Sequence, residues 1–288
     1  MTQDTDHPDR ENPDSDNPDS DHPDRDHPET GSQDTAYTDH FGPEGLRVRG
    51  TVVVVPGRGE TRATYARFGR RLAADAYRVR VVDAPPAGPG TREAVATGTA
   101  ARLADAIEGT AGEDGVVRPV IVVGADSGAA AVLAVLGRAG AQDPVRADAL
   151  VLAGLPDRPA AAGGSWDAEL DVRTSCPAHR GTLTDDPEVR RGALDEPLPE
   201  ALLNAAHEAD TALPVLMLAG DADPLADQDA LERLAKTLPL ARFSVVHGAH
   251  HDVLNDLQHR SVAAEVVSFL EALRNELRPL ISVRSSAW

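Results

Sequence analysis

The chain has 288 residues, of which 28 are basic and 47 acidic, and its net charge is −19. This excess of carboxylates leaves no basic face that could bind phosphates, so we expect neither nucleic acid nor an anionic membrane surface as a partner. We also expect no membrane insertion. Cys176 is the single cysteine, so an intrachain disulfide is excluded, and residues 1–30 lack the apolar run of a secretory signal. These features predict a cytoplasmic protein, and the composition, rich in Ala, Gly and Pro, is typical of a GC-rich bacterial genome.

Residues 1–44 are predicted to form a disordered tail. Thirteen of the acidic residues lie within residues 1–40, beside only two arginines, and a five-residue repeat such as Asp21-His22-Pro23-Asp24-Arg25 places a proline in every period. Proline removes a backbone donor and disfavours helix in the residue before it. Because the repeat contains no apolar side chain, nothing offsets the entropy that ordering would cost.

From residue 45 to residue 288 the pattern predicts one α/β domain. Apolar strand patterns occupy 52–55, 78–82, 120–123, 149–153, 214–219 and 242–246, and helical patterns occupy 62–76, 92–108, 129–136, 227–238 and 262–277. The run at 52–55 consists of valine alone, which is typical of a strand buried on both faces. Such alternation predicts a mostly parallel central sheet with helices on both faces.

Residues 155–212 interrupt this alternation. The segment has prolines and charges, no convincing strand, and one short helical pattern at 198–209. A connection of this length is uncommon inside a compact domain unless it has a function of its own. We therefore expect it to fold as a lid over the ends of the strands.

Three strand ends carry residues suited to chemistry, and ligands of open α/β sheets bind at these ends. The turn at 56–60, Pro-Gly-Arg-Gly-Glu, can aim backbone N–H groups into a cleft. The turn at 124–129, Gly-Ala-Asp-Ser-Gly-Ala, joins a strand to a helix and would present one side chain at its tip. The third end is double, with Asp221 and Asp223 after one strand and His250 and His251 after the last. Each motif alone also fits a helix cap or a plain turn.

Taken together, these motifs resemble the α/β-hydrolase superfamily, and within it the monoacylglycerol lipase and lysophospholipase-like branch. The resemblance runs from about residue 47 to 274 and rests on the turn at 56–60 with the helix and strand after it, the acid turn at 220–224 and the histidine loop at 248–252. It implies the α/β-hydrolase fold with a helical lid inserted after the sixth strand. It also implies Asp223 as the catalytic acid, His251 as the base, and an oxyanion hole formed by the backbone N–H groups of Arg58 and Ser127. Asp221 and His250 are the competing candidates, and we expect neither a cofactor nor a metal.

The nucleophile position departs from the family pattern, Gly-x-Ser-x-Gly. Matching the glycines places Asp126 at the nucleophile position, whereas a register slipped by one residue would place Ser127 there with Ala125 and Ala129 beside it. Strand length and the paired glycines favour Asp126. Proline also stands at position 56, where the family has histidine.

The identity of this one residue decides the expected reaction. A serine attacks an ester and forms an acyl-enzyme, whereas a carboxylate attacking an ester would form a mixed anhydride that is less stable than the ester. Aspartate nucleophiles in this fold resemble the epoxide hydrolase and haloalkane dehalogenase branch, in which the attacked atom is an alkyl carbon. That branch needs donors for its leaving group, yet the three tyrosines precede the lid and Trp166 is the only aromatic residue within it.

We therefore predict a hydrolase of a small or lipid-like apolar ester, with Asp126 or Ser127, Asp223 and His251 in its site. One alternative is an Asp126-dependent hydrolase of an epoxide or other alkyl electrophile. A second is a ligand-binding protein that keeps the fold without catalysis. A pair formed by Cys176 and His179 is a further candidate nucleophile, although no strand end or helix N-terminus stands beside it to activate the thiol.

Overall fold

A computed structural model describes residues 37–85, 92–137, 145–157, 164–282, 284 and 286. The chain divides into two units, Met1–Thr35 and Ala36–Trp288, and everything below concerns the second. Most of the predicted tail, residues 1–36, lies outside the described residues. None of the described helices is long and apolar enough to cross a membrane.

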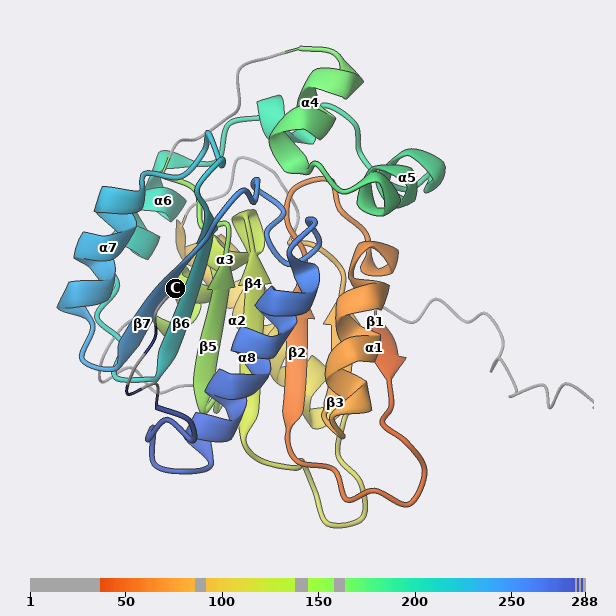
Figure 1. Cartoon of the computed structure of the whole chain (residues 1–288), viewed down its shortest axis with the longest axis vertical. Helices are drawn as coiled ribbons and strands as arrows, with labels where there is room; N and C mark the ends of the chain where they lie inside the picture. The colour runs from red at the N-terminus through yellow and green to blue at the C-terminus, as the bar shows by residue number, and fades with distance from the viewer. Residues whose placement is uncertain are drawn as a thin grey trace, which may run out of the picture. The chain divides into compact units, whose positions relative to one another are not determined.

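The described part of the chain forms the predicted α/β fold around a seven-stranded sheet with the order β1-β3-β2-β4-β5-β6-β7 (Figure 1). All neighbouring strands are parallel except β1 and β3. The strands are β1 (Tyr37–His40), β2 (Thr51–Val55), β3 (Arg78–Val82), β4 (Val120–Ala125), β5 (Ala149–Ala153), β6 (Val215–Gly220) and β7 (Ala241–Val246). All six predicted strands are present, each within two residues of its expected bounds.

The strand β1 corrects two sequence-based boundaries. It lies inside the segment assigned to the disordered tail, yet it pairs with β3, and Asp39 accepts two hydrogen bonds from the Arg80 guanidinium. Its sequence, Tyr-Thr-Asp-His, has no apolar run, so only the pairing with β3 reveals it. Since a single antiparallel strand precedes β2, the lid follows the fifth described strand, β5, and not the sixth.

Two helical layers cover the sheet because successive valines of β2 point to opposite faces. Val52 and Val54 share one core with α1 (Ala66–Ala74) and α8 (His259–Leu273), which lie on the near face in Figure 1. Val53 and Val55 share the other core with α2 (Arg92–Glu108), α3 (Ser127–Leu136) and α7 (Gln228–Thr237). A short 3₁₀ helix, η1 (Arg62–Tyr65), precedes α1. The sheet is therefore buried on both sides, and its C-terminal edge is left for chemistry.

The segment predicted as a lid contains more structure than expected. It holds α4 (Trp166–Arg173), α5 (Pro177–Asp185), the 3₁₀ turn η2 (Ala193–Asp195) and α6 (Glu200–His207). Figure 1 shows α4 and α5 above the C-terminal ends of the central strands, while α6 packs against α3. Only α6 was expected, because charged residues hide the apolar spacing of the other two helices. The Ser165 cap of α4 and the proline that begins α5 were the available signals.

Candidate active site

The turn between β4 and α3 presents Asp126 at its tip. The strand β4 extends to Ala125 and the helix begins at Ser127, so a single residue makes the turn, with φ 46° and ψ −118°. Residues with a side chain rarely adopt this conformation, and holding it costs free energy. The strand β4 extends two residues beyond its predicted end. Asp126, and not Ser127, therefore occupies this sharp turn between strand and helix, which we call the elbow. Ser127 becomes the first residue of the helix and is buried.

The glycines beside Asp126 are required by space. A Cβ on Gly124 would lie 2.6 Å from the Cα of Ala129, and a Cβ on Gly128 would lie 2.5 Å from the carbonyl oxygen of Val55. Both distances are shorter than side-chain carbons tolerate, and both neighbouring atoms belong to the backbone. The glycine pair therefore lets the helix pack directly against two strands, and this packing fixes the register of the elbow.

The carboxylate of Asp126 is bound by both the backbone and the side chain of Arg58. Its Oδ2 accepts the backbone N–H of Arg58 at 2.8 Å and the Nε–H at 2.9 Å, while its Oδ1 accepts an Nη2–H at 2.8 Å. Both residues are buried. The backbone N–H of Arg58, which the sequence assigned to an oxyanion hole, thus already binds one oxygen of the elbow side chain.

His251 links the elbow to the late strand ends. Its Nε2 lies 3.2 Å from Asp126 Oδ1, and its Nδ1 lies 2.9 Å from Asp223 Oδ2. Asp223 follows β6 and also accepts the backbone N–H of Leu225, while the backbone N–H of His251 donates to Val172 O in α4. Three turns that are far apart in the sequence therefore meet, with the order Asp126, His251, Asp223.

Opposing effects set the protonation of this buried group of residues. Burial lowers the pKa of His251, but the carboxylates of Asp223 and Asp126 outweigh it and raise the pKa to about 10. Burial raises the pKa of Asp126, but the positive charges of Arg58 and His251 hold it well below its usual range. At neutral pH His251 is therefore an imidazolium, and the two cations balance the two carboxylates.

Lid residues hold the Arg58 side chain and the turn on which it lies. Its Nη1–H donates to Glu196 O at 2.9 Å, and the lid residue Arg190 donates its backbone N–H to Gly59 O at 2.9 Å. The cavity that contains Asp126 and His251 has a volume of only about 10 Å³. A space this small holds at most about one water molecule. In this conformation the described residues therefore leave no room for a substrate beside Asp126 and His251.

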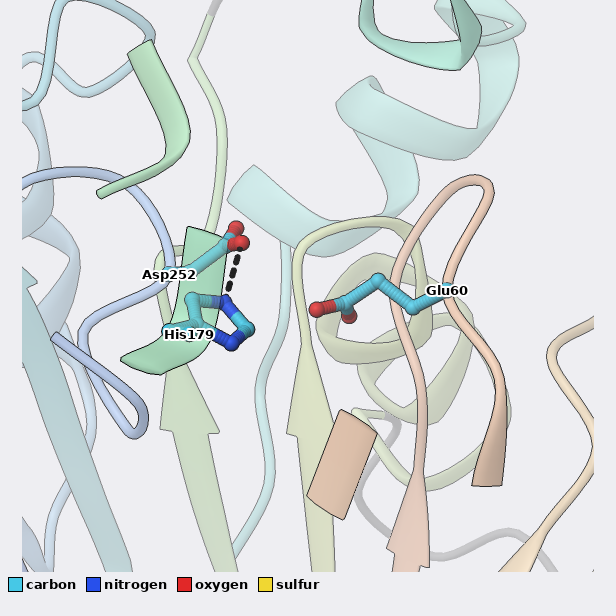
Figure 2. Close-up of side chains that lie close together, drawn as sticks. All are labelled: Glu60, His179 and Asp252. Atoms are coloured by element: carbon cyan, nitrogen blue, oxygen red, sulfur yellow. Dashed lines mark hydrogen bonds and ion pairs between the residues drawn. The ribbon is translucent and has the colours of Figure 1, made fainter. Parts of the chain in front are cut away.

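A second buried network adjoins the site. Glu60 Oε2 accepts the Tyr65 hydroxyl, His179 Nε2 lies 2.9 Å from Asp252 Oδ2, and Figure 2 shows the Glu60 carboxylate directed toward His179. The ligand atoms of Glu60, His179 and Asp252 lie within 4.8 Å of one another, as a metal site requires. The Arg173 guanidinium lies 3.5 Å from Asp252, however, and supplies the positive charge that a metal would bring. Burial, with the nearby charge of Asp252, raises the pKa of Glu60 to about 7.

The competing candidates named from the sequence have other partners. His250 Nδ1 lies 3.0 Å from Asp256, and Asp221 pairs with His247 on the surface. Neither pair involves the elbow. Asp223 and His251 are thus the acid and histidine that the fold brings to Asp126.

Cys176 and His179 do not form a nucleophile pair of their own. The Cys176 sulfur lies 3.6 Å from an Arg67 nitrogen, and the imidazole of His179 is bound to Asp252. His179 therefore belongs to the network beside the site, in which sequence reasoning gave it no part. Sequence reasoning also missed the side chain of Arg58, since it considered only the backbone N–H of this residue. An arginine between the two glycines of a strand-end turn was the available signal.

Comparison with known proteins places the chain in a family. The profile of the serine aminopeptidase S33 family matches residues 47–258. The structure is similar to that of a soluble variant of the Saccharomyces cerevisiae monoglyceride lipase, with 15% identity, a TM-score of 0.64 and coverage of 82% of this chain and 91% of that one. It is also similar to the Paleococcus ferrophilus monoacylglycerol lipase, with 18% identity, a TM-score of 0.63 and coverage of 82% and 98%.

A third similar structure is the enol-lactonase of Burkholderia xenovorans, with 19% identity, a TM-score of 0.56 and coverage of 82% of this chain and 95% of that one. No curated protein matches in sequence. At these identities the solved structures establish the fold, and the family profile, which spans most of the chain, establishes the membership. The chain belongs to the serine aminopeptidase S33 family of α/β-hydrolases.

Proposed function

We propose that this protein is a hydrolase in which the carboxylate of Asp126 attacks an alkyl carbon, as in the opening of an epoxide. The position of the two carboxylate oxygens is the observation that supports this reaction best. Oδ2 accepts the backbone N–H of Arg58, while Oδ1 faces the imidazole of His251. Oδ2 is thus already bound as the carbonyl oxygen of the Asp126 ester would be, and Oδ1 is the atom that would form the bond to the substrate carbon.

In the first step Oδ1 forms a bond to the substrate carbon and the carbon–oxygen bond of the epoxide breaks. The proton that His251 carries ends on the epoxide oxygen, which becomes an alcohol, and a neutral imidazole remains. The loss of the Asp126 charge favours this transfer, because that charge is one of the two that raise the pKa of His251.

In the second step neutral His251 takes a proton from water, and the hydroxide attacks the carbonyl carbon of the Asp126 ester. The negative charge develops on Oδ2, which already accepts the backbone N–H of Arg58. Collapse of this intermediate breaks the bond between the carbonyl carbon and Oδ1. The departing Oδ1 takes the proton of the hydroxyl group that water supplied, so the diol leaves and a carboxylate remains. The carboxylate and the imidazolium are restored, so the cycle closes with one water consumed.

The proposed substrate is small and apolar. Ala125, Ala153 and Leu254 offer apolar surface around the cavity, which is also lined by Glu60, Tyr65 and Asp252 of the adjoining network. We expect the reaction to require no cofactor. The single cysteine favours the cytoplasm as its compartment, and the composition favours a bacterial source.

A second candidate is the hydrolysis of a small or lipid-like ester. Two similar structures are those of a monoglyceride lipase and a monoacylglycerol lipase, which favours an ester substrate. The obstacle is the elbow, since Asp126 would form a mixed anhydride with an acyl group. Ester hydrolysis would need Ser127 to act from the first turn of α3.

Labelled water separates the two reactions. The protein is incubated with terminal epoxides and with nitrophenyl esters in oxygen-18 water. After one turnover, the mass of the peptide that carries Asp126 is measured by mass spectrometry. The proposal predicts heavy oxygen in the Asp126 carboxylate, ordinary oxygen in the first product, and no reaction of the Asp126→Asn variant. Labelling of Ser127 by a fluorophosphonate, with an unlabelled Asp126, would establish the esterase instead. Binding of these compounds without consumption would show that the site is not catalytic.

A further inference from the structure

The proposed reaction needs a group that stabilises the leaving atom. As Asp126 Oδ1 bonds to carbon, its negative charge passes to the atom that leaves. Tyr65 is an aromatic donor that lines the cavity, but its hydroxyl is hydrogen-bonded to Glu60. The indole of Trp166 donates to Thr184 within the lid. The Tyr65 hydroxyl and the Trp166 indole thus both donate to other groups.

The guanidinium of Arg58 is in the right place for this role. Its Nη2 lies 2.8 Å from Oδ1, and its Nε lies 2.9 Å from Oδ2. The Nη2–H group donates along the line from Nη2 to Oδ1. A substrate carbon that bonds to Oδ1 along this line must take the place of the Nη2–H group. In a displacement the attacking atom, the carbon and the leaving atom lie nearly in line, so the leaving atom would face the guanidinium.

We infer that Arg58 is a further catalytic residue, whose guanidinium transfers its hydrogen bonds from Asp126 to the leaving atom of the substrate. This inference rests on the proposed function. Arg58 gives up no proton, since the proton of the alcohol comes from His251. As the negative charge moves from Asp126 Oδ1 to the epoxide oxygen, the hydrogen bonds of the Arg58 guanidinium move with it. Before the reaction it pairs with the nucleophile, and after the carbon–oxygen bond breaks it pairs with the alkoxide.

Two features of the site support this exchange of partners. Arg58 is buried, so its interaction with a developing charge is little weakened by water. Its Nη1 is held by the carbonyl oxygen of Glu196 in the lid, which leaves the edge formed by Nε and Nη2 to face the reacting atoms. The same contact makes the position of the guanidinium depend on the lid residue Glu196.

The test compares two leaving groups on one alkyl chain. Hexyl bromide releases a weakly basic bromide, whereas the terminal epoxide of hexene releases a strongly basic alkoxide that depends far more on a donor. The rate of Asp126 alkylation at saturating substrate is measured by rapid quenching and intact-protein mass spectrometry. The variants are Arg58→Gln and Arg58→Lys, and Arg191→Gln is the matched control, because it removes an exposed cation of the lid whose side chain contacts Thr184 and Trp166 rather than Glu196.

Removal of one preorganised donor typically costs about 10² to 10³ in rate. We therefore expect Arg58→Gln to slow alkylation by the epoxide about 100-fold and alkylation by the bromide less than about 10-fold. Arg58→Lys should show a smaller loss with the same preference for the bromide, and it carries the test if the glutamine variant does not fold. Arg191→Gln should react like the wild type.

Each outcome has a distinct meaning. Equal losses for the two substrates would overturn the role of Arg58 in leaving-group stabilisation and leave the Asp126 reaction standing. A wild-type protein that neither substrate alkylates would overturn the proposed function itself. Loss of the epoxide reaction in Arg191→Gln would assign the effect to net charge rather than to the contact of Arg58.

Discussion

The backbone N–H and the guanidinium of Arg58 both donate to one carboxylate, that of Asp126. A single residue thus positions the elbow carboxylate through its main chain and neutralises it through its side chain. Because both groups are buried, removing either one leaves the other charge without its main partner. The same pair occupies both oxygens of the elbow carboxylate, so in the proposed reaction it must open before a substrate carbon can reach Oδ1.

Replacement of His251 should trap the covalent intermediate. Alkylation by hexyl bromide needs no proton, so His251→Gln should still form the Asp126 ester, but without a base the hydrolysis should slow about 10³-fold. Intact-protein mass spectrometry should show the mass of the hexyl adduct persisting in the variant, while the wild type returns to its starting mass. Turnover at the wild-type rate in His251→Gln would contradict the role of His251 as the base.

His251 should also make stability depend on pH. Its pKa is about 10 in the folded protein, against an ordinary value of 6.5. The folded state therefore holds the proton more tightly, and this stabilisation is complete below pH 6.5 and disappears as the pH rises toward 10. Within this window the free energy of unfolding should fall by up to about 1.4 kcal/mol per pH unit.

Urea unfolding of the wild type and of His251→Gln between pH 6 and pH 10 measures this contribution as the difference between the two curves. Other groups that titrate in the same range cancel in the difference. Parallel curves would show that the imidazole is neutral in the folded protein.

Glu60 should destabilise the protein at alkaline pH. Burial raises its pKa from 4.5 to about 7, so ionisation becomes costly in the folded state, and stability is lost as the pH rises from 4.5 to 7. Glu60→Gln keeps an oxygen to accept the N–H of Gly57 and the hydroxyl of Tyr65. Between pH 5 and pH 8 the difference in unfolding free energy should shift in favour of the variant, by on the order of 2 kcal/mol. The same difference at both pH values would refute this.

The elbow should not tolerate a methyl group. Gly124→Ala would place a carbon 2.6 Å from the backbone of Ala129, and overpacking of this kind costs about 1–3 kcal/mol. The control is Gly98→Ala in the exposed part of α2, where no atom lies within 4 Å of the added carbon and the helix should gain about 0.5–1 kcal/mol. Thermal and urea unfolding of the two variants give the comparison, and equal stabilities would show that the elbow can relax.

The sequence by itself was sufficient for the sheet and its helices, because the valines of β2 and the apolar spacing of α1 and α8 are local signals of burial. It was also sufficient to name the strand ends that carry Asp126, Asp223 and His251, since parallel strands bring such ends to one edge. It did not reveal β1, whose four residues form a strand only by pairing with β3.

Only the tertiary structure decided how the site is arranged. The choice between Asp126 and Ser127 depends on where β4 ends, and that end is fixed by the packing of Gly124 and Gly128 against neighbouring backbone. The contact between the Arg58 side chain and Asp126 joins residues 68 positions apart in the chain, and no local pattern encodes it. The protonation of His251 likewise follows from charges that come together only on folding, because a pKa depends on distance and burial in space rather than on order in the sequence.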